Sequence, residues 1–84
     1  MPVIARFYGI IIKMYFRQSE HGVPHFHALY GEYDAVFAVE PLEMLEGDLP
    51  TRAQRLVLEW ATFHQRELLD MWNRQEFREL PGLE

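Results

Sequence analysis

Three of the four histidines of this chain, His21, His25 and His27, lie within seven residues of one another. If Pro24 precedes a strand, the two-residue period of strands places His25 and His27 on one face, with His21 on the loop before them. Imidazoles at this spacing can converge on one ion, and three of them suit zinc, nickel, copper or iron better than magnesium. The metal-ligand candidates are therefore His21, His25 and His27, with Glu20 as a ligand or as a partner that orients a ring.

The same histidines could also work without a metal. A ring that titrates near neutral pH beside a second ring can move protons during phosphodiester cleavage, so His25 and His27 are the candidate catalytic residues. Lys13 and Tyr15 could then bind the phosphate, whereas Asp34, like Glu20, is a candidate metal ligand or ring-orienting partner. No phosphate-binding loop, nucleophile elbow or paired-carboxylate motif accompanies them. A structural or interface role is the third interpretation, so enzymatic activity stays an open question.

The elements that position these residues follow from short apolar runs and turn residues. We expect a hairpin turn at Gly31-Glu32, because glycine supplies the positive φ that tight turns need. The predicted strands are residues 3–7, 10–17, 25–30 and 33–40, with a further short strand at 43–45. Thr51 is the expected N-cap of a long helix from Arg52 to about Arg78, and Pro81-Gly82 ends the pattern.

The strands agree on which face is apolar. With Tyr30 opposite Tyr33, alternation gathers one apolar set: Phe26, Ala28, Tyr30, Tyr33, Ala35, Phe37, Val39, Ile10, Ile12, Met14 and Phe16. The other face is mixed, and it holds His25, His27, Lys13, Tyr15, Arg17, Asp34 and Glu40 together with Ile11, Leu29, Val36 and Ala38. The prediction is an α+β fold, a small and mainly antiparallel sheet of three to five strands covered on one face by a long C-terminal helix.

The helix carries two apolar lines. The stripe expected to cover the sheet consists of Ala53, Leu56, Val57, Trp60, Phe63, His64, Leu68 and Met71. Within it, His64 is expected to be a core or boundary residue bonded to Glu67. A second line, Leu58, Leu69 and Trp72, lies on a different side and is predicted to be an exposed interface.

Composition and charge restrict the class of protein. A chain of 84 residues supports one domain, residues 1–84, and so small a core is marginal alone, which favours a homo-oligomer such as a homodimer. The hydrophobic fraction of 49% indicates a folded chain, and the lack of cysteine excludes disulfides and thiolate metal sites. A net charge of −5 does not favour nucleic-acid binding through phosphates. No signal peptide or membrane span is apparent, so we expect a cytoplasmic protein.

Several motifs resemble those of the small bacterial proteins grouped as domain of unknown function 4160 (DUF4160). The similar segments are Met1-Pro2, Phe7-Tyr8-Gly9, Pro24-His25-Phe26-His27-Ala28, Tyr30-Gly31-Glu32-Tyr33 and Leu58-Glu59-Trp60-Ala61. Many relatives carry Asp-His-x-Pro-Pro-His-x-His, which matches Glu20, His21, Val23, Pro24, His25 and His27, with Glu20 in place of the aspartate and Val23 in place of the first proline. The resemblance implies no established reaction. It does imply a gene neighbour that encodes another small protein, as in toxin–antitoxin-like or regulatory pairs.

Two functions follow as hypotheses. The first is a small interaction or regulatory module that self-associates and binds a protein partner, with a toxin–antitoxin-like pair as its candidate setting. The alternative is a metal-dependent or histidine-based hydrolase, for which RNA is the candidate substrate, built on His21, His25 and His27. The only cofactor under consideration is a divalent transition metal.

Overall fold

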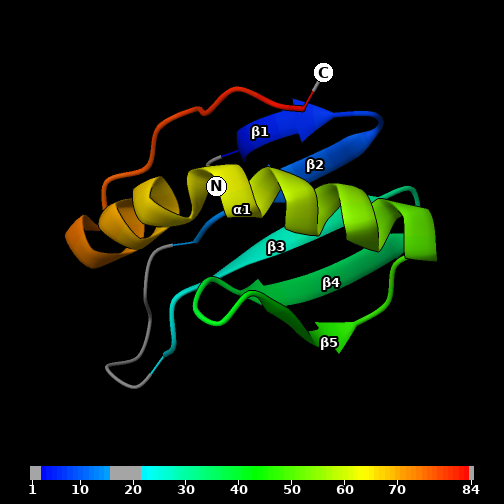
Figure 1. The fold of residues 1–84 in the computed structure, drawn as a ribbon, viewed down its shortest axis with the longest axis horizontal. Coiled ribbons are helices and arrows are strands. Elements are labelled where there is room, and N and C mark those ends of the chain that lie inside the picture. The colour runs from blue at the N-terminus through cyan, green and yellow to red at the C-terminus, as the bar shows by residue number, and fades with distance from the viewer. Residues whose placement is uncertain (1–2, 16–21, 84) are drawn as a thin grey trace.

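The computed structural model describes residues 3–15 and 22–83 as an antiparallel sheet and one long helix. Its five strands form a meander in chain order: β1 (Val3–Phe7), β2 (Ile10–Lys13), β3 (His25–Tyr30), β4 (Tyr33–Ala38) and β5 (Glu43–Gly47). The helix α1 (Thr51–Arg74) lies across one face of the sheet (Figure 1). The predicted α+β fold is confirmed, including the optional fifth strand, which extends two residues further than expected.

The hairpin turns follow the expected glycine chemistry. Tyr30 pairs with Tyr33 across Gly31, whose φ is +59°, so the predicted two-residue turn between β3 and β4 is confirmed. Between β1 and β2, Tyr8 and Gly9 both have positive φ, 49° and 81°. Two-residue turns with positive φ match the twist of neighbouring strands and set the pairing of the residues next to the turn.

The face of the sheet beneath α1 is the predicted apolar face. Buried residues on this face are Ile10, Ile12, Phe26, Ala28, Ala35 and Phe37 in the strands, with Met14 and Val39 just past the ends of β2 and β4. Tyr30 and Tyr33 were assigned to the same face but remain 36% and 43% exposed, because they flank the turn at the end of a hairpin. Phe16 lies outside the described residues.

Strand β5 depends on a glycine at its end. Gly47 pairs with Ala35 at φ +90°, and a Cβ atom there would overlap the carbonyl oxygen of Asp34 and lie 2.6 Å from the Cα atom of Ala35. The amide of Asp48 also donates to that carbonyl oxygen, at 3.1 Å. Close backbone approach therefore requires glycine at this position.

The helix ends differ from the sequence-based expectation. Pro50, not Thr51, occupies the N-cap position, and no side chain caps the first turn. The helix ends at Arg74 because Gln75 adopts the left-handed conformation, and the next amide, that of Glu76, donates to the carbonyl of Met71 at 3.2 Å. Within the described part of the chain, no helix is long and apolar enough to cross a membrane.

The buried stripe of α1 is rotated relative to the predicted one. It consists of Ala53, Val57, Trp60, Ala61, Leu68, Met71 and Trp72. Phe63, which the periodicity predicts to be in the core, is 71% exposed, since it lies about a third of a turn away from the centre of this stripe. His64 has non-helical φ and ψ and its Nδ1 lies 2.7 Å from a carboxylate oxygen of Glu67. The predicted boundary role of His64 is confirmed.

The segment after the helix turns back toward the first strand (Figure 1). The Leu80 amide donates to the carbonyl oxygen of Ile4 in β1 at 2.6 Å, and the Leu80 side chain is buried. The indole Nε1 of Trp60 donates to the carbonyl oxygen of Pro81 at 2.8 Å. The C-terminal segment thus fastens α1 to β1, although the sequence indicated only the end of a helix.

Candidate functional site

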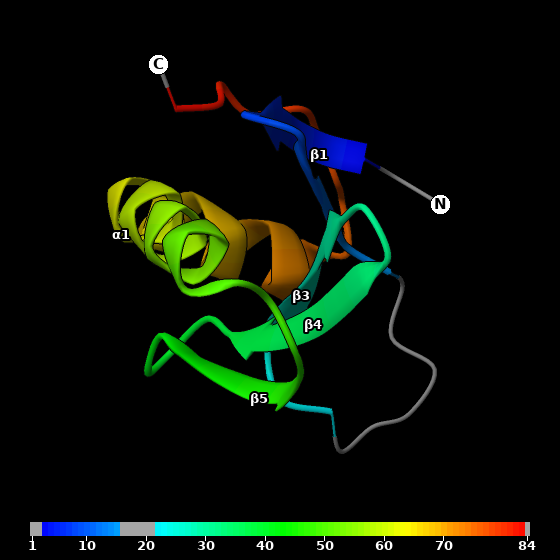
Figure 2. The same cartoon turned by 90° about the vertical axis from the view of Figure 1, so that its right-hand side faces the viewer.

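His25 and His27 lie on the face of the sheet opposite α1. They alternate along β3 with Phe26 and Ala28, which are buried beneath the helix, and both histidines are half-buried. Figure 2 shows α1 on one side of the sheet, and no other described helix or strand on the opposite side. The predicted arrangement of two histidines on the outer face of the sheet is confirmed.

Strand pairing places His27 in a row that crosses four strands. Lys13 of β2 pairs with His27, His27 pairs with Val36 of β4, and Val36 pairs with Glu46 of β5. Directly paired residues of antiparallel strands point to the same face, so a lysine, a histidine and a glutamate share this row. The sequence indicated Lys13 beside the histidines. It did not indicate Glu46, because a register shift between Val36 and Phe37 decides which β5 residue joins the row.

Aromatic rings enclose the two imidazoles. The ring centroids of His25 and His27 are 5.5 Å apart, and the Tyr15 ring packs edge-on against His27 at 4.5 Å. The indole of Trp72 lies 4.8 Å from His25. This contact is reached because the C-terminal end of α1 extends past the ends of the strands (Figure 1), where His25 begins β3.

The environment of His25 selects one tautomer. Its Nδ1 lies 2.7 Å from the carbonyl oxygen of Val23, and a carbonyl oxygen can only accept a hydrogen bond. Nδ1 therefore carries the hydrogen, and in the neutral ring Nε2 keeps its lone pair. An imidazole oriented by a backbone carbonyl in this way is typical of metal ligands and of general bases.

Burial lowers the pKa of His27 below its usual value of 6.5, and the neighbouring His25 lowers it further. The carboxylates of Asp34 and Glu46 act in the opposite direction without reversing the shift. The lowered pKa favours the neutral ring of His27 at pH 7. Its ring can accept a proton or bind a ligand without first losing a proton.

The two rings line a shallow hollow of about 310 Å³, which we term the histidine hollow. Its lining residues are Gly22, Val23, His25, His27, Val36, Leu45 and Glu46. Val23 and Leu45 are 55% and 46% exposed, so the hollow is bordered by apolar side chains. Sequence reasoning missed Val23, Leu45 and Glu46 as site residues because they come from a loop and a strand whose positions only the fold determines.

A comparison with known protein families found a match. The family model described as domain of unknown function (DUF4160) matches residues 9–73, which is most of the chain. The chain belongs to the DUF4160 family. This confirms the resemblance seen in the sequence motifs. No curated protein and no solved structure matches the chain.

Only part of the proposed ligand set of this DUF4160 chain can be placed. Glu20 and His21 lie outside the described residues, whereas His25 and His27 are brought together. Within residues 3–15 and 22–83, no group of three or more histidine, aspartate or glutamate side chains is arranged to hold an ion. The described part of the site is therefore a pair of imidazoles.

The three candidate interface residues of this DUF4160 chain have different surroundings. Trp72 is 3% exposed and packs inside the chain against His25, so its prediction as part of an exposed line is wrong. The physical reason is the rotated stripe of α1, which turns Trp72 toward the sheet. Leu58 and Leu69 are half-buried and pack against the core with part of each side chain accessible.

Proposed function

We propose that the chain is a small regulatory binding module that self-associates and binds a protein partner through the outer face of its sheet. The observation that carries the proposal is the exposed apolar border of the histidine hollow, formed by Val23 and Leu45. Ile11, Leu29 and Val36 continue this surface as half-buried side chains. Apolar area of this kind on a small protein is typical of interaction sites.

The polar groups of the hollow suit recognition as well as chemistry. The Nδ1 of His25 is bonded to the Val23 carbonyl, which leaves Nε2 to face a partner, and the lowered pKa of His27 favours its neutral form, which costs less to bury than a charged ring. The carboxylate of Glu46 lies at the border of the hollow, where it can pair with a basic group. A toxin–antitoxin-like pair, with the neighbouring small protein as the partner, is the biological setting that we propose for this surface.

The experiment compares one substitution on the outer sheet face with a matched one elsewhere. Leu45→Arg introduces a charge beside the hollow, and Phe63→Arg introduces the same charge at an exposed aromatic position on α1. Light scattering during size-exclusion chromatography should give a mass above that of one chain for the wild type and for Phe63→Arg, and a monomer for Leu45→Arg. The small protein encoded by the neighbouring gene should co-purify with the wild type and with Phe63→Arg, but not with Leu45→Arg. A monomeric wild type that binds this neighbour equally well with and without Leu45→Arg would refute the proposal.

A second candidate function is a metal-dependent or histidine-based hydrolase, with RNA as its candidate substrate. The observation that favours it is the pair of adjacent imidazoles, one of them oriented by the Val23 carbonyl. Zinc binding to untagged protein, measured by calorimetry, should be lost in His25→Ala and His27→Ala. His64→Ala is the control, since His64 is bonded to Glu67 outside the hollow. Equal zinc binding by all four proteins would refute the ligand assignment, and RNA cleavage that survives both hollow variants would refute the catalytic one.

A further inference from the structure

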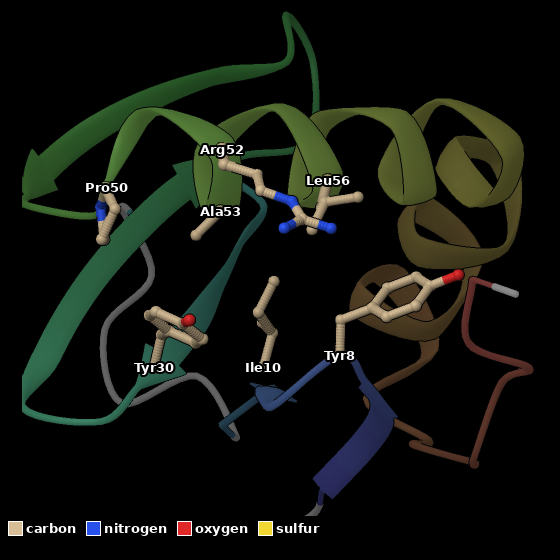
Figure 3. Close-up of a pocket in the computed structure, with 7 residues that line it drawn as sticks. All are labelled: Tyr8, Ile10, Tyr30, Pro50, Arg52, Ala53 and Leu56. Atoms are coloured by element: carbon tan, nitrogen blue, oxygen red, sulfur yellow. The ribbon is translucent and has the colours of Figure 1, made fainter.

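A second hollow of about 250 Å³ lies between the first turns of α1 and the two hairpin turns of the sheet (Figure 3). We term it the tyrosine hollow, and the lining residues that matter here are Tyr8, Ile10, Tyr30, Arg52, Ala53 and Leu56. It shares no residue with the histidine hollow. Its base is apolar, because Ile10 and Ala53 are buried.

Two tyrosine side chains line this hollow on either side of Ile10, as Figure 3 shows. Tyr8 is 54% exposed and sits at positive φ in the first hairpin turn, a conformation that a bulky residue seldom adopts. The position of Tyr30 is held from both sides, because its ring stacks on Tyr33 at 6.5 Å and a Cβ atom on Gly9 would lie 3.4 Å from its Cε1 atom. The backbone of the turns thus keeps two large rings around a space that neither of them fills.

The positively charged side chain of Arg52 lies on the third side of the tyrosine hollow. Arg52 extends from the first turn of α1 over the hollow (Figure 3), and among the described residues it forms no ion pair. No acidic residue lies in the first helical turn to compensate it, and Arg55 follows one turn later. Basic side chains at the positive end of a helix add to its positive potential, and the acidic residue that shares an adjoining hollow with Arg52 and Arg55 is Glu59, almost two turns along the helix from Arg52.

We propose that the tyrosine hollow binds a small ligand in which a flat ring carries an anionic group. The ring lies between Tyr8 and Tyr30, over Ile10 and Ala53, and the anion pairs with the guanidinium of Arg52. Guanidinium recognises carboxylate and phosphate with the same paired hydrogen bonds, so both anions belong to the proposed class. The volume is at the lower end of ligand pockets, which limits the ligand to about one ring system.

The test combines two anionic probes with their neutral analogues. The carboxylate probe is indole-3-carboxylate, compared with indole-3-carboxamide, and the phosphate probe is uridine monophosphate, compared with uridine. Calorimetry or changes in amide chemical shifts should show saturable binding of at least one anionic probe, tighter than its neutral analogue. The preferred anion identifies whether the site takes a carboxylate or a phosphate.

Two arginine variants test the assignment of the anion site. Arg52→Ala should weaken binding of the anionic probe by roughly tenfold to a hundredfold, the range expected for loss of a charge-assisted hydrogen bond, and leave the neutral analogue unchanged. Arg55→Ala removes the same charge from the same helix end but does not line the hollow, so it should change affinity by less than about threefold.

Three outcomes would overturn the proposal. One is the absence of saturable binding by either anion to the folded wild-type protein. Another is an equal loss in Arg52→Ala and Arg55→Ala, which would indicate general charge attraction. The third is equal affinity for an anion and its neutral analogue. Because Arg52 is exposed and makes no ion pair with the described residues, its variant should keep the circular dichroism spectrum of the wild type.

Discussion

Gly47→Ala should detach β5 from the sheet, and Gly31→Ala provides a matched control. Both glycines have positive φ, +90° for Gly47 and +59° for Gly31. They differ in the space around the missing side chain. A Cβ atom at Gly47 would overlap the Asp34 carbonyl oxygen and lie 2.6 Å from the Cα atom of Ala35, whereas nothing lies within 4 Å at Gly31. The pair therefore separates backbone conformation from steric overlap.

The expected losses of stability follow from the backbone conformation and the steric overlap at each position. A left-handed conformation costs a non-glycine residue about 1–2 kcal/mol. Replacing glycine by alanine also makes the unfolded chain less flexible, which stabilises the folded state by about 0.4–1 kcal/mol. Gly31→Ala should thus lower the free energy of unfolding by at most about 1.5 kcal/mol. At Gly47 the overlapping atoms belong to the backbone of β4, so no side-chain rotation relieves them and the two strands must separate. We expect a total loss of about 3–4 kcal/mol for Gly47→Ala.

Urea unfolding followed by tryptophan fluorescence measures both losses. Amide chemical shifts provide a second readout, because separation of β5 moves Leu45 and Glu46 and opens one wall of the histidine hollow. Gly31→Ala should leave those two signals in place. Equal losses of stability in the two variants, or unchanged Leu45 and Glu46 signals in Gly47→Ala, would refute the steric argument.

Three further predictions follow from the packing. The pKa of His27 is lowered in the folded chain, so as the pH falls the unfolded chain protonates this ring at a higher pH than the folded chain does. The free energy of unfolding should therefore decrease as the pH falls from about 7.5 to about 5. His27→Gln should reduce this decrease, and an identical pH dependence would contradict the shift. Trp60→Phe removes the hydrogen bond to the Pro81 carbonyl, which should cost about 1–3 kcal/mol and speed hydrogen exchange in the C-terminal segment; unchanged exchange would argue against that tether. Trp72→Ala should cost about 3–5 kcal/mol and Phe63→Ser less than about 0.5 kcal/mol in urea unfolding, whereas similar losses would contradict their assigned burial.

Local patterns in the sequence determined the order of the elements and the faces of the central strands. The two-residue period placed His25 and His27 on one side of β3 and Phe26 on the other, because adjacent side chains of a strand must point in opposite directions. The turn at Gly31 determined the pairing of β3 with β4, since a two-residue turn permits a single register. These features depend on neighbours along the chain, and the sequence contains them directly.

The tertiary structure decided which distant residues meet. Glu46 shares a row with His27 because of a register shift between Val36 and Phe37, and no local pattern marks such a shift. Trp72 packs on His25 because the helix extends past the ends of the strands before it ends at Arg74. The tyrosine hollow likewise joins two hairpin turns to the first turns of α1. Each contact depends on the relative placement of elements far apart in the chain, which is set by packing of the whole core and not by the period of any one segment.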